Sequence, residues 1–166
     1  MIVLGVDPGL SLTGWGFVSS PDRNSLSLIC YGCIKTASGT NLIERLKIIN
    51  HTLRGLIREH KPECMAIEEL FFAKEARTVA SVGQARGAIL MAAADENLPV
   101  FEYNPRKVKI AVTGYGSADK NQIQQMMKTM FRLKEIPKPD DAADAIAIAV
   151  THMQTSRISA IAGIKA

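Results

Sequence analysis

The chain has 166 residues, of which 47% are hydrophobic and 22% are charged, and its formal net charge is +4. These values are typical of a globular protein, which at this length buries about 70% of its unfolded surface, and they exclude a disordered, collagen-like or coiled-coil protein. We therefore expect a single domain over residues 1–166. The modest positive charge is compatible with an anionic partner but does not identify one.

Nothing in the sequence indicates export or insertion into a membrane. No apolar run approaches the ~18 residues that a membrane span needs, and no basic segment precedes the apolar run that begins at Ile2. There are three cysteines, and a domain of this length does not need disulfides to fold. We expect a reduced, cytoplasmic protein.

The first third of the chain predicts three strands. Residues 2–6 form a β-branched apolar run, which Asp7, Pro8 and Gly9 close with a turn. Residues 14–19 and 25–35 also have strand-like patterns, separated by a cluster of turn residues. We expect these three strands to form an antiparallel meander.

The pattern then becomes helical. Apolar residues recur every three or four positions from Leu42 to Ile57, which predicts an amphipathic helix. Thr40 is a candidate for its N-cap, and Pro62 is expected to end it.

The remainder alternates strands with helices, which predicts an α/β fold with a mixed sheet and helices on its faces. Residues 155–166 have no long periodic pattern, so we expect a short mobile tail there. The expected strands cover 64–70 and 99–103, and the expected helices cover 73–96, begin near 105 and after 117, and run from 141 to about 154.

Four acidic residues fall where such a sheet gathers its ligands. Asp7 follows the first strand, and Glu68 lies near the end of the fourth. Asp141 and Asp144 share one face of the last helix, whose alanines allow it to approach the sheet closely. Clustered carboxylates repel unless a cation offsets them, and oxygen ligands favour Mg²⁺ or Mn²⁺ over zinc. Two such ions about 4 Å apart can promote hydrolysis of a phosphodiester.

Each acid also has an ordinary structural explanation. Asp7 before Pro-Gly can simply start a turn. Glu68 and Glu69 alternate along a strand, so we expect one of them to be only a surface charge. Asp140 can cap the last helix. The joint placement of the acids, rather than any single one, favours a metal site.

Short blocks along the chain, taken together, resemble the RuvC-type Holliday junction resolvases, which have a ribonuclease H-like fold. The resemblance extends over residues 2–152, with the blocks in the order of the family. The blocks are Asp7-Pro8-Gly9 with Thr13-Gly14, Ala66-Ile67-Glu68, Gly83-Gln84-Ala85-Arg86-Gly87, Phe101-Glu102-Tyr103, Gly116-Ser117-Ala118-Asp119-Lys120 and Asp141-Ala142-Ala143-Asp144-Ala145.

The resemblance implies a Mg²⁺-dependent crossover junction endodeoxyribonuclease, a hydrolase of DNA recombination and repair. Two Mg²⁺ ions, replaceable by Mn²⁺, would be held by Asp7, Glu68, Asp141 and Asp144. The products would carry 5′-phosphate and 3′-hydroxyl ends. The resemblance also implies a homodimer that nicks two strands of like polarity in a four-way junction, beside the branch-migration complex of RuvA and RuvB. A two-fold symmetric protein matches a two-fold symmetric substrate.

Basic residues are concentrated between Asn104 and Lys134, where seven lysines and arginines face only Asp119, a net charge of 7 − 1 = +6. By resemblance, Lys109 and Lys120 match cations near the scissile phosphate, where positive charge stabilises the reaction. The default alternative for such residues is a solvated helix face. The further candidates for contacts to the DNA backbone are Lys74, Arg77, Arg86, Arg106 and Lys107.

Phe71 and Phe72 follow the Glu68 strand in a predicted loop. In the family, an aromatic residue matching Phe71 stacks on or wedges between bases at the junction centre, as suits unstacked nucleotides. We expect one of the pair to contact DNA and the other to be core. Trp15 and Phe17 share one face of a strand and are expected in the core.

A nucleotide-binding fold of the actin and sugar-kinase type also opens with a strand and an Asp-x-Gly turn. That architecture needs two such lobes, and this chain contains one Asp-x-Gly strand. An ATP-binding function is therefore disfavoured.

Two other functions stay open, namely a noncatalytic nucleic-acid-binding module and a related ribonuclease H-like nuclease for RNA-DNA hybrids or flaps. Acids at all four positions argue against the noncatalytic module. The aromatic pair Phe71 and Phe72 and the basic segment favour the four-way junction over other structured substrates.

Overall fold

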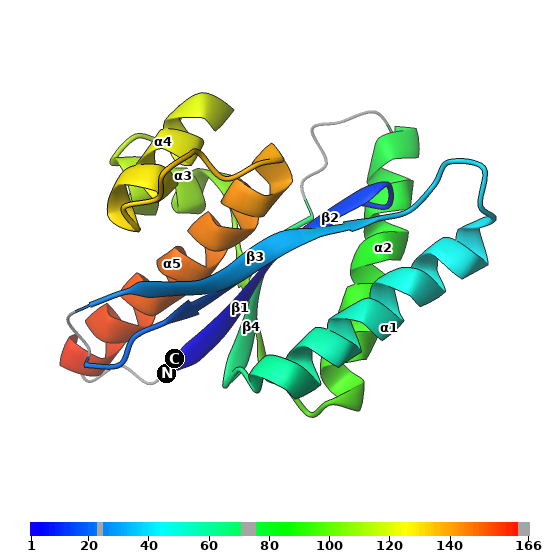
Figure 1. Cartoon of the computed structure of the whole chain (residues 1–166), viewed down its shortest axis with the longest axis horizontal. Coiled ribbons are helices and arrows are strands. Elements are labelled where there is room, and N and C mark those ends of the chain that lie inside the picture. Colours follow the sequence, from blue (N-terminus) through cyan, green and yellow to red (C-terminus); the bar gives the residue numbers. More distant parts are fainter. Residues whose placement is uncertain (23–24, 71–75, 163–166) are drawn as a thin grey trace.

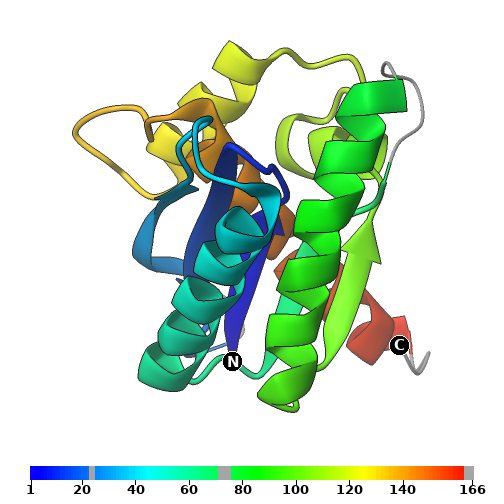
Figure 2. The same ribbon diagram turned by 90° about the vertical axis from the view of Figure 1, so that its right-hand side faces the viewer.

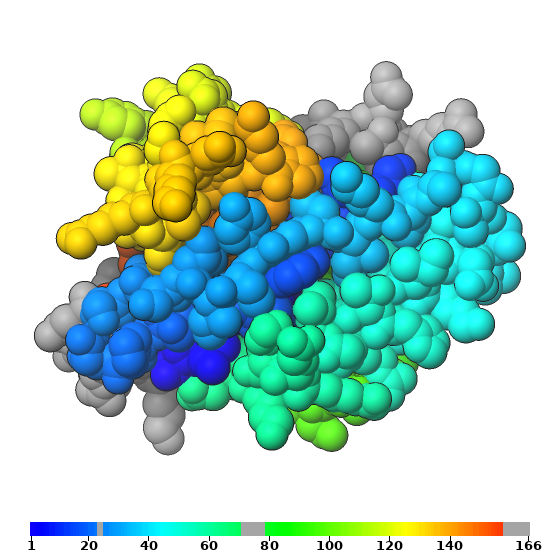
Figure 3. Space-filling model, in the orientation of Figure 1, coloured from blue at the N-terminus to red at the C-terminus, as the bar shows by residue number. Residues whose placement is uncertain are grey.

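In the computed structural model, which describes residues 1–22, 25–70 and 76–162, three antiparallel strands begin the chain. β1 spans Ile2–Asp7, β2 spans Leu12–Ser19 and β3 spans Ser27–Lys35. β2 lies between the other two, so the predicted meander is confirmed. β3 forms one edge of the sheet and crosses the exposed face in Figure 3.

Two parallel strands complete the sheet. β4 spans Cys64–Glu68 and pairs with β1, and β5 spans Val100–Tyr103 and pairs with β4. The strand order is β3-β2-β1-β4-β5, which confirms the predicted mixed sheet. Because β1 and β4 are parallel neighbours near the middle, their carboxyl ends open at the same edge.

Helices cover both faces of the sheet, as Figures 1 and 2 show. α1 (Leu42–His60) and α2 (Ala76–Asp95) lie on one face. The other face carries three helices, α3 (Pro105–Thr113), α4 (Lys120–Met130) and α5 (Asp140–Ala162). Each face has its own core, since successive strand residues point to opposite sides. The described part of the chain thus has the predicted α/β architecture.

The boundaries of two helices correct the sequence predictions. Asn41, not Thr40, is the N-cap of α1, because its side chain accepts the backbone N–H of Glu44 at 3.0 Å. The last helix does not end near Gln154 but continues to Ala162. The mobility of 155–166 stays a prediction, and residues 163–166 lie outside the described part of the chain.

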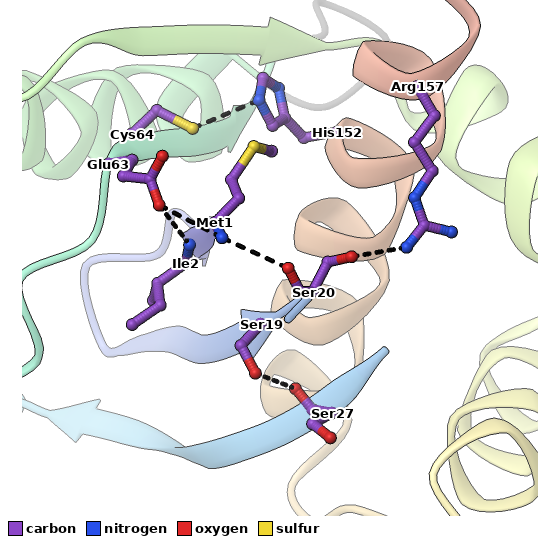
Figure 4. A network of polar contacts seen from close by, with 9 residues as sticks. All are labelled: Met1, Ile2, Ser19, Ser20, Ser27, Glu63, Cys64, His152 and Arg157. Carbon is purple, nitrogen blue, oxygen red and sulfur yellow. Dashed lines mark hydrogen bonds and ion pairs between the residues drawn. The ribbon is translucent and has the colours of Figure 1, made fainter. Parts of the chain in front are cut away.

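Polar contacts at the amino ends of β1 and β4 tie the later turns of α5 to the sheet (Figure 4). Arg157 donates to Ser20 Oγ at 2.7 Å. His152 Nε2 lies 3.2 Å from Cys64 Sγ. The contact of Arg157 with Ser20 holds α5 to the sheet beyond its predicted end near Gln154. The network lies at the end of the sheet away from Asp7.

The sheet allows α5 an unusually close approach. Gly5 of β1 and Gly14 of β2 face this helix, and a Cβ at Gly14 would overlap the carbonyl oxygen of Asp141. A Cβ at Gly5 would overlap the carbonyl oxygen of Ala145. The alanines of α5 and these glycines together let the two backbones touch, as the alanine pattern predicts.

No helix in the described residues is long and apolar enough to cross a membrane. Trp15 and Phe17 pack on the α1 face with their ring centroids 5.9 Å apart, and Phe17 is fully buried. Phe17 is thus a core residue, as predicted, whereas Trp15 is only partly buried and packs against the core.

Candidate active site

Asp7 is the last residue of β1 and faces α5. Alternation along the strand places Val3, Gly5 and Asp7 on this side, whereas Leu4 and Val6 pack on the other. Burial raises the pKa of Asp7 well above its ordinary value, and three neighbouring negative charges raise it further. These charges belong to Glu68, Asp144 and Asp141.

The turn after Asp7 is held by side-chain hydrogen bonds. Thr36 Oγ1 donates to the Leu10 carbonyl at 2.5 Å. Arg45 donates to Thr36 Oγ1 and to Ser11 Oγ, each at 2.8 Å. Sequence reasoning missed Arg45, because its partner Ser11 is 34 residues away and no local pattern links them.

Glu68 ends β4, and the parallel pairing of β1 with β4 brings it beside Asp7. Both residues line one cavity. Glu69 also lines this cavity, and its Oε2 accepts a hydrogen bond from Asn104 Nδ2 at 3.4 Å. The expectation that one of the two glutamates is only a surface charge is therefore wrong, because both line the cavity.

α5 contributes the other two carboxylates from its first turns. Asp141 and Asp144 are three residues apart and line the same cavity. Burial raises the pKa of Asp141, and it raises the pKa of Asp144 to about 6. α5 packs its backbone directly against Gly14, and this close contact brings the side chains of Asp141 and Asp144 to the end of β1.

The cavity has a volume of about 490 Å³ and opens at the carboxyl ends of β1 and β4. All four predicted carboxylates line it, together with Lys109 and Lys120. Within the described residues, no three His, Cys, Asp or Glu side chains close around a single point to hold a metal ion. The four carboxylates therefore line the cavity without forming a ready three-ligand cage in the part of the chain that the structure describes.

The two predicted lysines reach the cavity from different helices. Lys109 comes from α3 and Lys120 is the first residue of α4, where the Asp119 capping box begins the helix. Lys120 Nζ forms an ion pair with Asp140, and this hydrogen bond raises the pKa of Lys120. The charge of Lys120 offsets part of the rise in the pKa of Asp7 and of Asp144, which both stay above their ordinary values.

Asp140 is a site residue that the sequence analysis treated only as a helix cap. It is instead the first residue of α5, and its carboxylate faces Lys120. The hydrogen bond from Lys120 lowers the pKa of Asp140. No sequence signal joins these two residues, which lie 20 positions apart in different helices.

Arg86 lies at the cavity wall rather than on an open surface. Its side chain is 14% exposed, and its Nη2 atom stands 2.6 Å from Glu102 Oε2. The two groups form an ion pair, but their geometry does not meet that of a hydrogen bond, and the buried Nη2 atom has no hydrogen-bond partner among the described residues. Arg86 Nε donates to the Glu68 carbonyl at 3.4 Å, a long contact that links α2 to the end of β4.

The other predicted DNA contacts differ in how far the structure describes them. Arg106 and Lys107 are exposed on α3, and Lys107 Nζ stands 5.3 Å from the centroid of the Tyr103 ring. Arg77 lies in the first turn of α2, but its side chain is outside the description. Outside the described residues altogether lie Phe71, Phe72 and Lys74.

Comparisons with known proteins agree on one family. The family described as crossover junction endodeoxyribonuclease RuvC matches residues 3–152. The protein of that name from Endomicrobium trichonymphae is 58% identical over 93% of this chain and 82% of its own length. The one from Desulforamulus reducens is 51% identical over 94% of this chain and 95% of its own.

Solved structures agree with these sequence relatives. RuvC of Thermus thermophilus in complex with a Holliday junction substrate is 35% identical, with a TM-score of 0.89 over 96% of each chain. The yeast mitochondrial Holliday junction resolvase Ydc2 is 13% identical, with a TM-score of 0.65 over 97% of this chain and 83% of its own, which shows a shared fold alone.

Proposed function

Because the chain belongs to the RuvC family of crossover junction endodeoxyribonucleases, we propose that it resolves Holliday junctions by metal-dependent hydrolysis of DNA phosphodiesters. The observation that carries this proposal is the set of four carboxylates along one cavity at the carboxyl ends of β1 and β4. Two Mg²⁺ ions, or Mn²⁺ in their place, would be held by Asp7, Glu68, Asp141 and Asp144.

The donor set fits magnesium. Every proposed ligand is a carboxylate oxygen, the type that Mg²⁺ and Mn²⁺ prefer. Burial and then the negative charges of the neighbouring acids raise the pKa of Asp7, and bound cations would offset both effects. Mg²⁺ is usually held by one or two carboxylates with waters and substrate phosphates, so a cage of three acids is not required.

When bound, two such ions supply an activated water and a counter-charge for the leaving oxygen of an in-line displacement. The chain itself holds the acids in place. Asp7 and Glu68 are fixed by adjacent strands, and Asp141 and Asp144 by a helix packed directly on those strands. Lys109 supplies positive charge at the cavity wall, where charge builds up on the phosphate.

Lys120 supplies a second cation at the cavity, from the start of α4. Its side chain is 69% exposed and borders the cavity, so a DNA phosphate can reach it without unfolding any element. The neighbouring exposed cations Arg106 and Lys107 extend this positive surface along α3. Phosphate contacts of this kind make DNA binding strongly dependent on salt.

The proposal includes a homodimer, because a four-way junction offers two equivalent strands to a two-fold symmetric enzyme. It further includes action beside the branch-migration complex of RuvA and RuvB. We place the protein in the cytoplasm, with its three free cysteines Cys30, Cys33 and Cys64 reduced. Phe71 or Phe72 would contact unstacked bases at the junction centre.

The decisive experiment uses a labelled synthetic four-way junction and a matched duplex, each with and without Mg²⁺. We expect paired, symmetric nicks that are confined to the junction and that need the metal. Asp7→Asn should abolish cleavage and leave junction binding in place, because it removes a proposed metal ligand and not the DNA surface. Binding is measured by gel shift and cleavage by the end-labelled products.

Two outcomes would overturn parts of this proposal. Cleavage by Asp7→Asn in Mg²⁺ at the wild-type rate would refute the metal assignment of Asp7. Binding without cleavage, across several divalent metals and junction sequences, would instead indicate a noncatalytic DNA-binding module.

A further inference from the structure

Two large side chains are exposed on the segment between the proposed catalytic residues Lys109 and Lys120. Tyr115, in the turn between α3 and α4, is 72% exposed, and Ile110 of α3 is 48% exposed. Ile110 lies against Gly116, so the two apolar side chains border the same turn. Single exposed apolar residues are common on protein surfaces. The backbone and the charges around this pair are what set it apart.

The backbone that carries Tyr115 is well fixed. Gly114 ends α3 with φ of 81°, a left-handed conformation that favours glycine. Thr113 Oγ1 donates to the Lys109 carbonyl at 2.8 Å and accepts the backbone N–H of Tyr115 at 3.1 Å. A ring presented from an ordered backbone loses little conformational freedom on binding.

The charged residues near Tyr115 along the chain are mostly basic. Residues 104–120 contain Arg106, Lys107, Lys109 and Lys120 and one acidic residue, Asp119, whose side chain caps α4. Lys109 lines the catalytic cavity, and the side chain of Arg106 lies against Gly116, next to Tyr115. A strand whose phosphate lies at Lys109 would therefore continue onto a positive surface that carries an aromatic ring.

We propose that Tyr115 stacks on a base of the DNA strand leaving the cavity, with Ile110 against the same nucleotide and Arg106 at its phosphate. This inference rests on the proposed function, because the strand concerned is the one cleaved. An aromatic face beside cations matches a nucleotide, which offers a π-face and a negative charge. Protein partners fit this surface less well, since stacking on a ring suits the flat face of a base.

The test compares Tyr115→Ala and Tyr115→Phe for junction binding in the absence of divalent metal. Tyr115→Ala should weaken binding about tenfold, the effect expected for loss of one stacked base. Tyr115→Phe keeps the ring and should bind within twofold of wild type. Tyr31→Ala on edge strand β3 is the matched control, since Tyr31 is also exposed and lies outside the site.

A second readout follows the same interaction during cleavage. At limiting junction in Mg²⁺, Tyr115→Ala should cleave about tenfold more slowly than wild type, in proportion to its loss of affinity, whereas Tyr115→Phe should cleave at nearly the wild-type rate. Should Tyr115→Ala lower the melting temperature, Tyr115→Leu keeps apolar bulk without a ring and provides the same comparison.

The inference would be overturned if Tyr115→Ala bound the junction with wild-type affinity. It would also be overturned if Tyr115→Phe lost as much affinity for the junction as Tyr115→Ala. A wild-type protein that neither binds nor cleaves the junction would instead refute the proposed function. The two failures are therefore distinguishable.

Discussion

At the scale of single residues, Lys120 both pairs with Asp140 and lines the cavity of the proposed active site. The ion pair is exposed, with 69% of the Lys120 side chain and 36% of the Asp140 side chain accessible. Pairs of this kind contribute only about 0–1 kcal/mol to folding, so they exchange partners easily. A DNA phosphate arriving at Lys120 must compete with Asp140.

This competition predicts that Asp140→Asn binds the junction more tightly than wild type, by several-fold at low salt. The substitution frees Lys120 for the phosphate and removes a negative charge from the lip of the cavity. The measurement is a gel-shift titration over a range of KCl concentrations. Asp95→Asn, which removes the same charge from the far end of α2, is the control. Unchanged or weaker binding by Asp140→Asn would contradict the prediction.

The sequence could predict the four carboxylates, because each was tied to a local pattern. Asp7 and Glu68 close apolar strand runs, and Asp141 and Asp144 have the spacing of one helix face. Asp140 could not be assigned in the same way. An acid at the start of a helix satisfies the expectation for a cap, and only the tertiary fold reveals its partner Lys120.

At the scale of elements, the position of α5 depends on two glycines in the sheet. A Cβ at Gly14 would overlap the backbone carbonyl of Asp141, and a backbone atom cannot rotate away as a side chain can. Any side chain there must push the first turn of α5 off the sheet. Asp141 and Asp144 would move with it.

We therefore predict that Gly14→Ala destabilises the fold by about 1–3 kcal/mol, the usual effect of overpacking, and also abolishes most cleavage. Junction binding should suffer less, because Lys109 lies on another helix. Gly55→Ala is the control: Gly55 lies on α1 with nothing within 4 Å of its would-be Cβ, and alanine there should stabilise by up to about 1 kcal/mol. Urea unfolding and junction cleavage measure the two effects. If Gly14→Ala cleaved the junction at the wild-type rate, a Cβ at this position would not displace Asp141 and Asp144, and the prediction would be wrong.

The close approach of α5 was predictable from its alanines, but its length was not. Thr155, Ser156 and Arg157 interrupt the apolar pattern, which indicates a tail. In the fold, two of these polar side chains make hydrogen bonds. Ser156 Oγ lies 3.1 Å from His152 Nε2, and Arg157 donates a hydrogen bond to Ser20 Oγ. Ser20 lies 137 residues from Arg157, and a contact across that separation leaves no periodic signal in the sequence.

At the scale of the whole molecule, folding gathers four like charges from β1, β4 and α5 into one cavity. The pKa values of Asp7, Asp141 and Asp144 are all raised. Burial is the main cause for each of them, and neighbouring negative charges raise each value further. For Asp144 the pKa rises from 3.8 to about 6. The folded state thus holds a proton on Asp144 more tightly than the unfolded state does, and protonation of Asp144 favours folding. This contribution to the free energy of unfolding is complete below about pH 4 and is lost as the pH rises through 6.

His152 acts in the opposite direction, because burial lowers its pKa and the fold favours its neutral form. That contribution is present above pH 6.5 and falls as the pH is lowered. The pH profile of wild type alone therefore mixes two effects. A comparison with Asp144→Asn isolates the carboxylate, since His152 is common to both proteins.

In EDTA at pH 7.5, Asp144→Asn should be more stable than wild type, on the order of 2 kcal/mol, because it removes a charge that the fold disfavours. The difference should be about half as large at pH 5, where wild-type Asp144 is mostly protonated in the folded state. Mg²⁺ should reverse the order by stabilising wild type alone, through binding to the folded state. Urea unfolding at the two pH values, with and without Mg²⁺, measures all three effects. If Asp144→Asn were no more stable than wild type at pH 7.5 in EDTA, the acids of the cavity would not be under electrostatic strain, and the charge argument for a metal would lose its physical basis.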